Sequence, residues 1–116
     1  MFAKLFLFAL PALAAPALKR TDGDITYYHP STGTSACNQN HGDDDMVVAL
    51  GASLFDSESL CGKTIKLQGD AGEITVTVAD RCEGCQPDDL DVSPAAFKKA
   101  IGPLTKGRGK GTWSFA

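Results

Sequence analysis

The sequence of 116 residues predicts a single small all-β domain of the barrel class. Three observations support this prediction. Short runs of β-forming residues alternate with turn residues, only one segment carries clear helix signals, and four cysteines can cross-link a small core. A chain of this length has room for one domain.

The first twenty residues have the features of a secretory leader. Lys4 precedes a short apolar run, and Ala12-Leu13-Ala14 fits the small-x-small pattern of a signal-peptide cleavage site. The run is shorter than the roughly 20 apolar residues that span a bilayer. Lys19-Arg20 follows as a dibasic processing site would. We therefore expect residues 1–20 to be a signal peptide plus short pro-segment, and residues 21–116 to form one secreted, extracellular domain.

The charge of the expected domain is acidic. All fourteen acidic residues but only eight of the eleven basic residues follow position 20, so the net charge is near −6. An acidic protein is repelled by phosphate backbones and anionic lipid surfaces. We therefore expect neither nucleic acid nor, after processing, a membrane as partner, and we expect a monomer.

Five segments have the composition of β-strands, and a polar, glycine-bearing loop spans residues 31–45. The alternating segments 63–68 and 73–80 flank the turn sequence GDAG and predict a hairpin. The strand segments, in chain order, are 24–30, 46–50, 63–68, 73–80 and 109–116.

Asp80 ends the second strand of this hairpin. Side chains two residues apart in a strand point to the same face, so Asp80 is expected on the core side with Ile74, Val76 and Val78. A carboxylate there is either satisfied by backbone N–H groups or held in a partly dry site with a raised pKa.

One helix is predicted after residue 92. Ser93 is a candidate N-cap, Pro94 suits the first helical position, and Gly102 ends the segment. Asp91 lies just before the helix, where the helix dipole favours a carboxylate, so it is either an electrostatic cap or a functional residue. The predicted buried stripe consists of Phe97, Ala100 and Ile101.

The four cysteines allow three interpretations. Cys82-x-x-Cys85 resembles a redox motif but lacks the βαβ context of one. Zinc would need these thiols, or His29 and His41, as ligands, whereas secretion oxidises thiols. Two disulfides are the expected state, with three possible connectivities. We expect no metal and no other cofactor.

Three further features have structural interpretations. The acidic run Asp43–Asp45 lacks the ligand spacing of an EF-hand and is expected to be a solvated turn. His41 is expected to be a loop residue. Trp113, which alternates with Phe115 on one strand face, is expected in the core rather than as a sugar platform.

The order of several short motifs resembles a known superfamily. "TYY", "SAC", "MVVAL", "CGKTIKL", "VTVADRC", "DLDVSPAAF" and a final "TW" follow each other as in double-psi β-barrels. The chain resembles secreted single-domain members of the expansin, barwin and rare-lipoprotein-A-like superfamily, with kiwellins and fungal expansin-like proteins nearest. The resemblance covers nearly all of residues 24–115 and implies a six-stranded double-psi β-barrel with one or two short helices. It also implies the disulfides Cys37–Cys61 and Cys82–Cys85.

The resemblance also implies a site. In expansins, an aspartate ending the "V-x-D" strand and another in the "L-D-x-S" motif line a groove for extended polysaccharide; here these positions are Asp80 and Asp91. The Thr-x-Tyr of the first strand matches Thr26 and Tyr28. The resemblance therefore implies a secreted module that binds cell-wall polysaccharide.

Hydrolysis is not expected. The related inverting endoglucanases need a second carboxylate, located two residues after the tyrosine, and that position is Pro30 here. Asp91 is the best candidate acid and leaves open a weak cleavage like that of lytic transglycosylases. The alternative from a different class is a protein-binding module, either a protease inhibitor or a secreted effector, with loop 31–45 as its contact surface.

Overall fold

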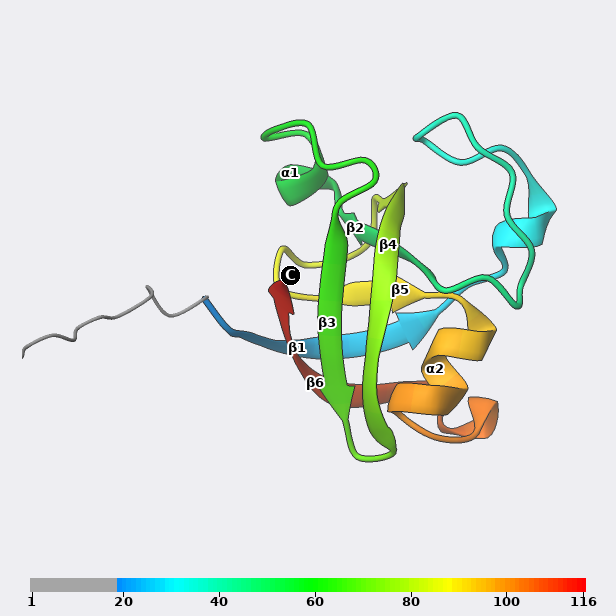
Figure 1. The fold of residues 1–116 in the computed structure, drawn as a ribbon, viewed down its shortest axis with the longest axis vertical. Coiled ribbons are helices and arrows are strands. Elements are labelled where there is room, and N and C mark those ends of the chain that lie inside the picture. Colours follow the sequence, from blue (N-terminus) through cyan, green and yellow to red (C-terminus); the bar gives the residue numbers. More distant parts are fainter. Residues whose placement is uncertain (1–18) are drawn as a thin grey trace, which may run out of the picture.

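The computed structural model describes residues 19–116, so the predicted leader up to residue 18 lies outside the described residues. Strands dominate the fold, with short helices between them (Figure 1). The elements are β1 Thr21–Tyr27, η2 Pro30–Thr32, β2 Val47–Gly51, α1 Ala52–Phe55, β3 Thr64–Gly69, β4 Gly72–Cys82, β5 Leu90–Val92, α2 Pro94–Ala100, η3 Leu104–Lys106 and β6 Arg108–Phe115.

The six strands close into one barrel, in the order β1-β5-β2-β4-β3-β6. Two neighbouring pairs, β1/β5 and β2/β4, are parallel, and the other four pairs are antiparallel. This is the six-stranded double-psi β-barrel that the resemblance implies. Among the strands of residues 19–116, only the β3/β4 hairpin, predicted from its alternation and turn, pairs strands that are consecutive in the chain.

The strand bounds differ from the predicted ones by three residues at β1 and by one or two residues at β2, β3, β4 and β6, and β5 was not predicted. β1 starts at Thr21, because its pairing with β6 extends to Trp113, and it ends before Pro30, which lacks a backbone N–H and opens η2. β5 was not predicted from periodicity, because a strand of three residues is too short to show any. It is nevertheless hydrogen-bonded on both sides, to β1 and β2.

The interior of the barrel is apolar and fully buried. Each strand contributes inward residues, and α2 closes one end of the barrel through contacts with β1, β3 and β4. Phe97, Ala100 and Ile101 are at most 3% exposed, so the predicted stripe is confirmed. Trp113 is 4% exposed, as expected of a core residue.

Helix α2 begins at the residue the sequence indicates. The buried Ser93 is the N-cap, and its Oγ accepts a hydrogen bond from Ala96 N at 3.2 Å. The helix ends at Ala100, two residues before Gly102, whose φ of 143° suits glycine.

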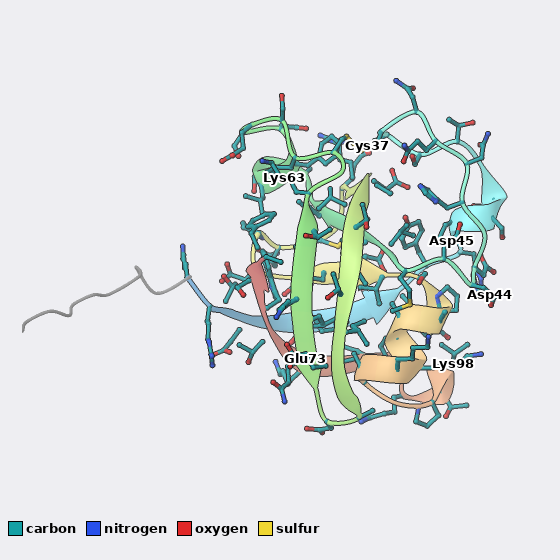
Figure 2. The ribbon with its side chains drawn as sticks, viewed as in Figure 1. Cys37, Asp44, Asp45, Lys63, Glu73 and Lys98 are labelled. Carbon is teal, nitrogen blue, oxygen red and sulfur yellow. A yellow bond between two sulfur atoms is a disulfide. The ribbon has the colours of Figure 1, made fainter. Side chains whose placement is uncertain are left out.

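All four cysteines form disulfides, Cys37–Cys61 and Cys82–Cys85, and this confirms the pairing that the resemblance implies. The first disulfide ties the long loop before β2 to the loop before β3 (Figure 2). Asp44 and Asp45 are exposed on the outside of that long loop, as expected of a solvated turn. None of the helices in residues 19–116 is long and apolar enough to cross a bilayer.

Candidate functional site: a polar row across four strands

The barrel register brings three of the four predicted site residues together. Thr26 in β1 lies opposite Asp91 in β5, Asp91 lies opposite Ala49 in β2, and Ala49 lies opposite Asp80 in β4. Directly opposed residues of neighbouring strands place their side chains on the same face. We call this outer-face set, Thr26, Asp91, Ala49 and Asp80, the polar row.

Asp91 is half-buried at the centre of the row. Its Oδ1 accepts a hydrogen bond from Thr26 Oγ1 at 3.0 Å. Burial raises the pKa of Asp91 and the nearby Asp80 charge adds to the rise, while the Thr26 hydrogen bond and Arg108 act in the opposite direction. The net pKa shift of Asp91 is therefore upward, and of the two roles expected for Asp91 the N-cap is taken by another residue. Asp91 lies within β5, and Ser93 occupies the N-cap.

Asp80 lies on the outer face, which corrects the strand-parity prediction. Val48 pairs with Val78 but Ala49 pairs with Asp80, so β4 has one extra residue, Ala79, at a β-bulge. Val78 and Ala79 are both buried, and the bulge turns the side chain of Asp80 away from the core.

Backbone N–H groups partly satisfy the Asp80 carboxylate, which was one of the two roles expected for it. Its Oδ1 accepts hydrogen bonds from Ala36 N and Arg81 N, both at 2.9 Å. The first of these bonds fastens the long loop to the end of β4.

Tyr28 supplies an unpartnered hydroxyl near both carboxylates. It follows β1 directly, and its N–H donates to Val92 O at 2.9 Å. Its Oη is buried and has no hydrogen-bond partner within residues 19–116. Burial raises the pKa of the phenol most, and the charges of Asp80 and Asp91 add to the rise. The Asp80 carboxylate also lies near enough to raise this pKa as a hydrogen-bond acceptor, although it does not meet hydrogen-bond geometry with Oη.

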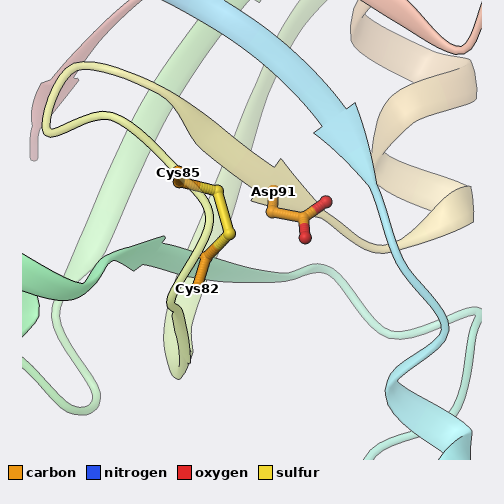
Figure 3. A group of neighbouring side chains, drawn as sticks. All are labelled: Cys82, Cys85 and Asp91. Carbon is orange, nitrogen blue, oxygen red and sulfur yellow. A yellow bond between two sulfur atoms is a disulfide. The ribbon is translucent and has the colours of Figure 1, made fainter.

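Two features of the site were not predicted. Arg108 in β6 lies opposite Thr26, so it extends the row by one strand. It forms an ion pair with Asp24 at 2.9 Å and helps to lower the pKa of Asp91. The second feature is the position of the Cys82–Cys85 disulfide beside Asp91 (Figure 3). The resemblance implied the disulfide itself but not this position, and the pairing of Arg108 with Thr26 joins segments far apart in the chain.

The polar side chains of the row and the neighbouring Tyr28 are hydrogen-bonding groups. Two carboxylates, a threonine hydroxyl and a phenol can accept from and donate to the hydroxyl groups of a carbohydrate. Pro30, at the position where a related hydrolase has its base, is buried at the start of η2 and has no group that accepts a proton.

The row is only partly exposed: Asp80 and Asp91 are intermediate in exposure, and Ala49 is 2% exposed. Two surface hollows of about 540 and 570 Å³ lie elsewhere, over β1, β3 and β6. Their linings share Gln68 and Thr112 and include none of the predicted site residues. We assign the candidate site to the row, because the row holds Asp91, whose carboxyl has a raised pKa, and lies beside Tyr28.

Comparisons with known proteins give relatives over most of the chain, although no family model matches it. The allergen Asp f 7 of Aspergillus fumigatus is 36% identical over 98 residues, which are 80% of this chain and 36% of the allergen. The chain therefore spans only about a third of that relative. The papain inhibitor of Streptomyces mobaraensis is 32% identical over 94% of this chain and 81% of the inhibitor.

Solved structures have the same barrel. An expansin from Clavibacter michiganensis, a point mutant in complex with cellohexaose, matches 84% of this chain and 50% of the expansin with a TM-score of 0.76 and 27% identity. A Streptomyces papain inhibitor matches 84% of this chain and 94% of the inhibitor with a TM-score of 0.74 and 29% identity. The closed barrel, the two disulfides and a relative aligned over most of both chains show that this chain belongs to the expansin, barwin and rare-lipoprotein-A-like superfamily of double-psi β-barrels.

Proposed function

We propose that the protein binds a cell-wall polysaccharide along the polar row without hydrolysing it. The observation that carries the proposal is the juxtaposition of Thr26, Asp91 and Asp80 on one face, beside the unpartnered Tyr28 Oη. Sugar hydroxyls can donate hydrogen bonds to the partly exposed carboxylates of Asp80 and Asp91. A row that crosses four strands also suits an extended chain better than a compact ligand.

The comparison with the expansin supports the ligand class. That protein was solved with cellohexaose, a β-linked glucan, and it has the same barrel. Among the four residues that we propose as contacts, Asp91 is expected to matter most. It lies in the middle of the row, and its partial burial strengthens hydrogen bonds to it.

Sedimentation with insoluble cellulose, chitin and peptidoglycan tests the proposal. The wild-type protein should bind at least one of these polymers, and Asp91→Ala should weaken binding at least tenfold, the equivalent of about 1.4 kcal/mol. Asp44→Ala, which removes an exposed carboxylate of the long loop, is the matched control and should bind like wild type. Failure to bind any polymer, or equal binding by Asp91→Ala, would contradict the proposal.

The setting of this function is the extracellular space. The leader-like first twenty residues and the two disulfides, which persist in oxidising compartments, support secretion. Expression with the full leader tests this point. Mature protein in the medium with Thr21 at its N-terminus is the expected product, and retention inside the cell would contradict secretion.

A second candidate function is binding of a protein partner, such as a papain-like protease. The similarity to the papain inhibitor favours this candidate, and so does the fixed conformation of the long loop 31–45. Several contacts hold this exposed loop in one conformation. They are the Cys37–Cys61 disulfide, the hydrogen bond from Ala36 N to Asp80, and the contacts of Asp43 with His29 at 2.8 Å and with Ser31 N at 3.2 Å. A preordered loop loses little entropy on binding.

Inhibition assays with a panel of papain-like proteases separate the two candidates. Under the second candidate, changes in loop 31–45 such as Asn38→Ala reduce inhibition, while Asp91→Asn leaves it unchanged. No inhibition across the panel would weigh against the inhibitor form of this candidate.

A further inference from the structure

Three potential metal ligands lie together beside the polar row. The Sγ atoms of Cys82 and Cys85 and a carboxylate oxygen of Asp91 lie within 4.8 Å of one another. The two cysteines end β4 and start the following turn, whereas Asp91 comes from β5 (Figure 3). All three residues are partly exposed, so solutes can reach them.

In the disulfide form these sulfurs do not bind a metal, because the ligand is the thiolate. Reduction changes the donor set to two thiolates and one carboxylate. This mixed set suits tetrahedral borderline cations such as Zn²⁺ and Co²⁺, whose bonds are about 2.3 Å to sulfur and about 2.1 Å to oxygen. Neighbouring ligand atoms around such an ion are then about 3.5–4 Å apart. Reduction lets the two sulfurs move apart to that spacing, and a carboxylate oxygen of Asp91 already lies within 4.8 Å of both.

We propose that reduction of the Cys82–Cys85 disulfide creates a divalent-metal site made of Cys82, Cys85 and Asp91. A thiol reductant supplies two electrons and two protons, the S–S bond breaks, and two thiols form while the reductant becomes a disulfide. Binding of the cation then releases both thiol protons to solvent. Water fills the fourth position, and Asp91 ligates through one oxygen while the other keeps the hydrogen bond from Thr26.

The segment between the cysteines and β5 is held in place by contacts other than the disulfide. Asp24 N donates to Asp89 Oδ1 at 3.0 Å, and Trp113 Nε1 donates to Asp88 O at 2.8 Å. The backbone of the turn also packs directly on two glycines, Gly23 and Gly51, where there is no room for a Cβ. Opening the S–S bond therefore leaves both thiols near Asp91.

The site also links redox state to the polar row. A bound cation takes up a carboxylate oxygen of Asp91, the residue to which we assign most of the polysaccharide binding. Reduced, metal-loaded protein is therefore expected to bind polysaccharide at least tenfold more weakly than the oxidised protein. This consequence rests on the proposed function, whereas metal binding itself does not.

Cobalt binding tests the site without any polysaccharide. The protein is treated with a limiting dithiol, the opened disulfide is identified by alkylation and mass spectrometry, and Co²⁺ alone is added. We expect one Co²⁺ per chain, with the visible bands of tetrahedral cobalt and sulfur-to-metal charge transfer. Zn²⁺ should displace it and abolish both absorptions. Asp91→Asn should weaken Co²⁺ binding at least tenfold, whereas Asp80→Asn and Glu83→Gln, which alter neighbouring carboxylates, should not.

Several outcomes would overturn the proposal. These are equal Co²⁺ binding by the oxidised protein, retention of the spectrum in Cys82→Ser/Cys85→Ser, and unchanged affinity in Asp91→Asn. Loss of the barrel, followed by circular dichroism, before Cys82–Cys85 opens would overturn it as well. If the proposed function fails but the metal site is real, the cobalt spectrum appears although no polysaccharide binds.

Discussion

Opposing electrostatic effects meet at Asp91. Burial and Asp80 favour the protonated carboxyl, whereas the Thr26 hydroxyl and Arg108 favour the carboxylate. A half-buried acid with a raised pKa is typical of functional sites, because it holds a poorly solvated charge ready for a ligand. At the scale of single residues, the site therefore depends on how its neighbours balance this one group.

Thr26→Val should raise the pKa of Asp91 further. The substitution removes the hydrogen bond that stabilises the carboxylate and keeps the size of the side chain. An NMR pH titration of the Asp91 carboxyl measures the shift. Thr112→Val is the control, because it removes a similar hydroxyl that donates to Asp22 instead. An unchanged pKa in Thr26→Val would show that the hydrogen bond has no effect.

Asp91→Asn should stabilise the folded protein at neutral pH. A carboxyl whose folded pKa is raised contributes stability at low pH, and that contribution is lost as the pH rises through the folded pKa. An amide does not titrate and so does not lose this contribution. The midpoint temperature of thermal unfolding should therefore rise by about 2–4 °C at pH 7 and by much less near pH 3. Asp44→Asn should give no such difference. A gain of equal size at both pH values would contradict the linkage.

At the scale of elements, the bulge in β4 and the close turn after it decide where the site lies. The extra residue, Ala79, moves Asp80 to the outer face, next to Ala49 and Asp91. The turn from Cys82 to Asp89 then packs on β1 at Gly23, where an added Cβ would lie 1.9 Å from Asp88 O. Only glycine allows β1 and this turn to approach so closely.

Gly23→Ala should therefore destabilise the protein by about 3 kcal/mol, because backbone atoms must move to admit a methyl group. Urea denaturation measures the change. Gly42→Ala is the matched control, since a Cβ there meets no atom within 4 Å, and its stability should stay within about 0.5 kcal/mol of wild type. Similar stabilities of the two variants would refute the packing argument.

The same contact should also affect the site, since displacement of the turn moves the Cys82–Cys85 disulfide away from Asp91. We expect the pKa of Asp91 to fall in Gly23→Ala, because burial is the largest cause of its rise. The NMR titration used for Thr26→Val measures this change. A pKa equal to that of wild type would mean that the turn does not contribute to the burial of Asp91.

At the scale of the whole molecule, the closed barrel and the two disulfides together stabilise the folded state of a small chain. In the part of the chain that the structure describes, closure leaves no unpaired sheet edge, and every strand has two partners. Cys37–Cys61 joins residues 24 positions apart, whereas Cys82–Cys85 joins residues three apart. A longer loop loses more entropy on closure in the unfolded chain, so the two disulfides differ in their effect on stability.

Removal of Cys37–Cys61 by paired serine substitutions should lower the free energy of unfolding by about 3 kcal/mol, and removal of Cys82–Cys85 by about 2 kcal/mol or less. Urea denaturation of both variants at one temperature gives the comparison. A larger loss from Cys82–Cys85 would mean that its contacts near the polar row, rather than chain entropy, dominate its contribution.

Patterns of residues close in sequence were sufficient to predict much of the fold. The β3/β4 hairpin followed from alternation and turn residues, helix α2 from Ser93 and Pro94, and the buried stripe from helical spacing, because each depends on residues close in sequence. The order of the short motifs, through the resemblance to a known superfamily, was sufficient to predict the barrel topology and the disulfide pairing. β5 was not predicted from periodicity, since its three residues are held by β1 and β2 rather than by local preference.

The sequence by itself determined the identity of the polar side chains, Thr26, Tyr28, Asp80 and Asp91, and the elements that hold most of them. Only the tertiary structure decided how they meet. A one-residue bulge reverses the face of Asp80, and barrel closure brings Arg108 into line with Thr26. The turn after β4 places a disulfide beside Asp91. The physical reason is that register and burial depend on contacts between strands far apart in the chain, which no local pattern encodes.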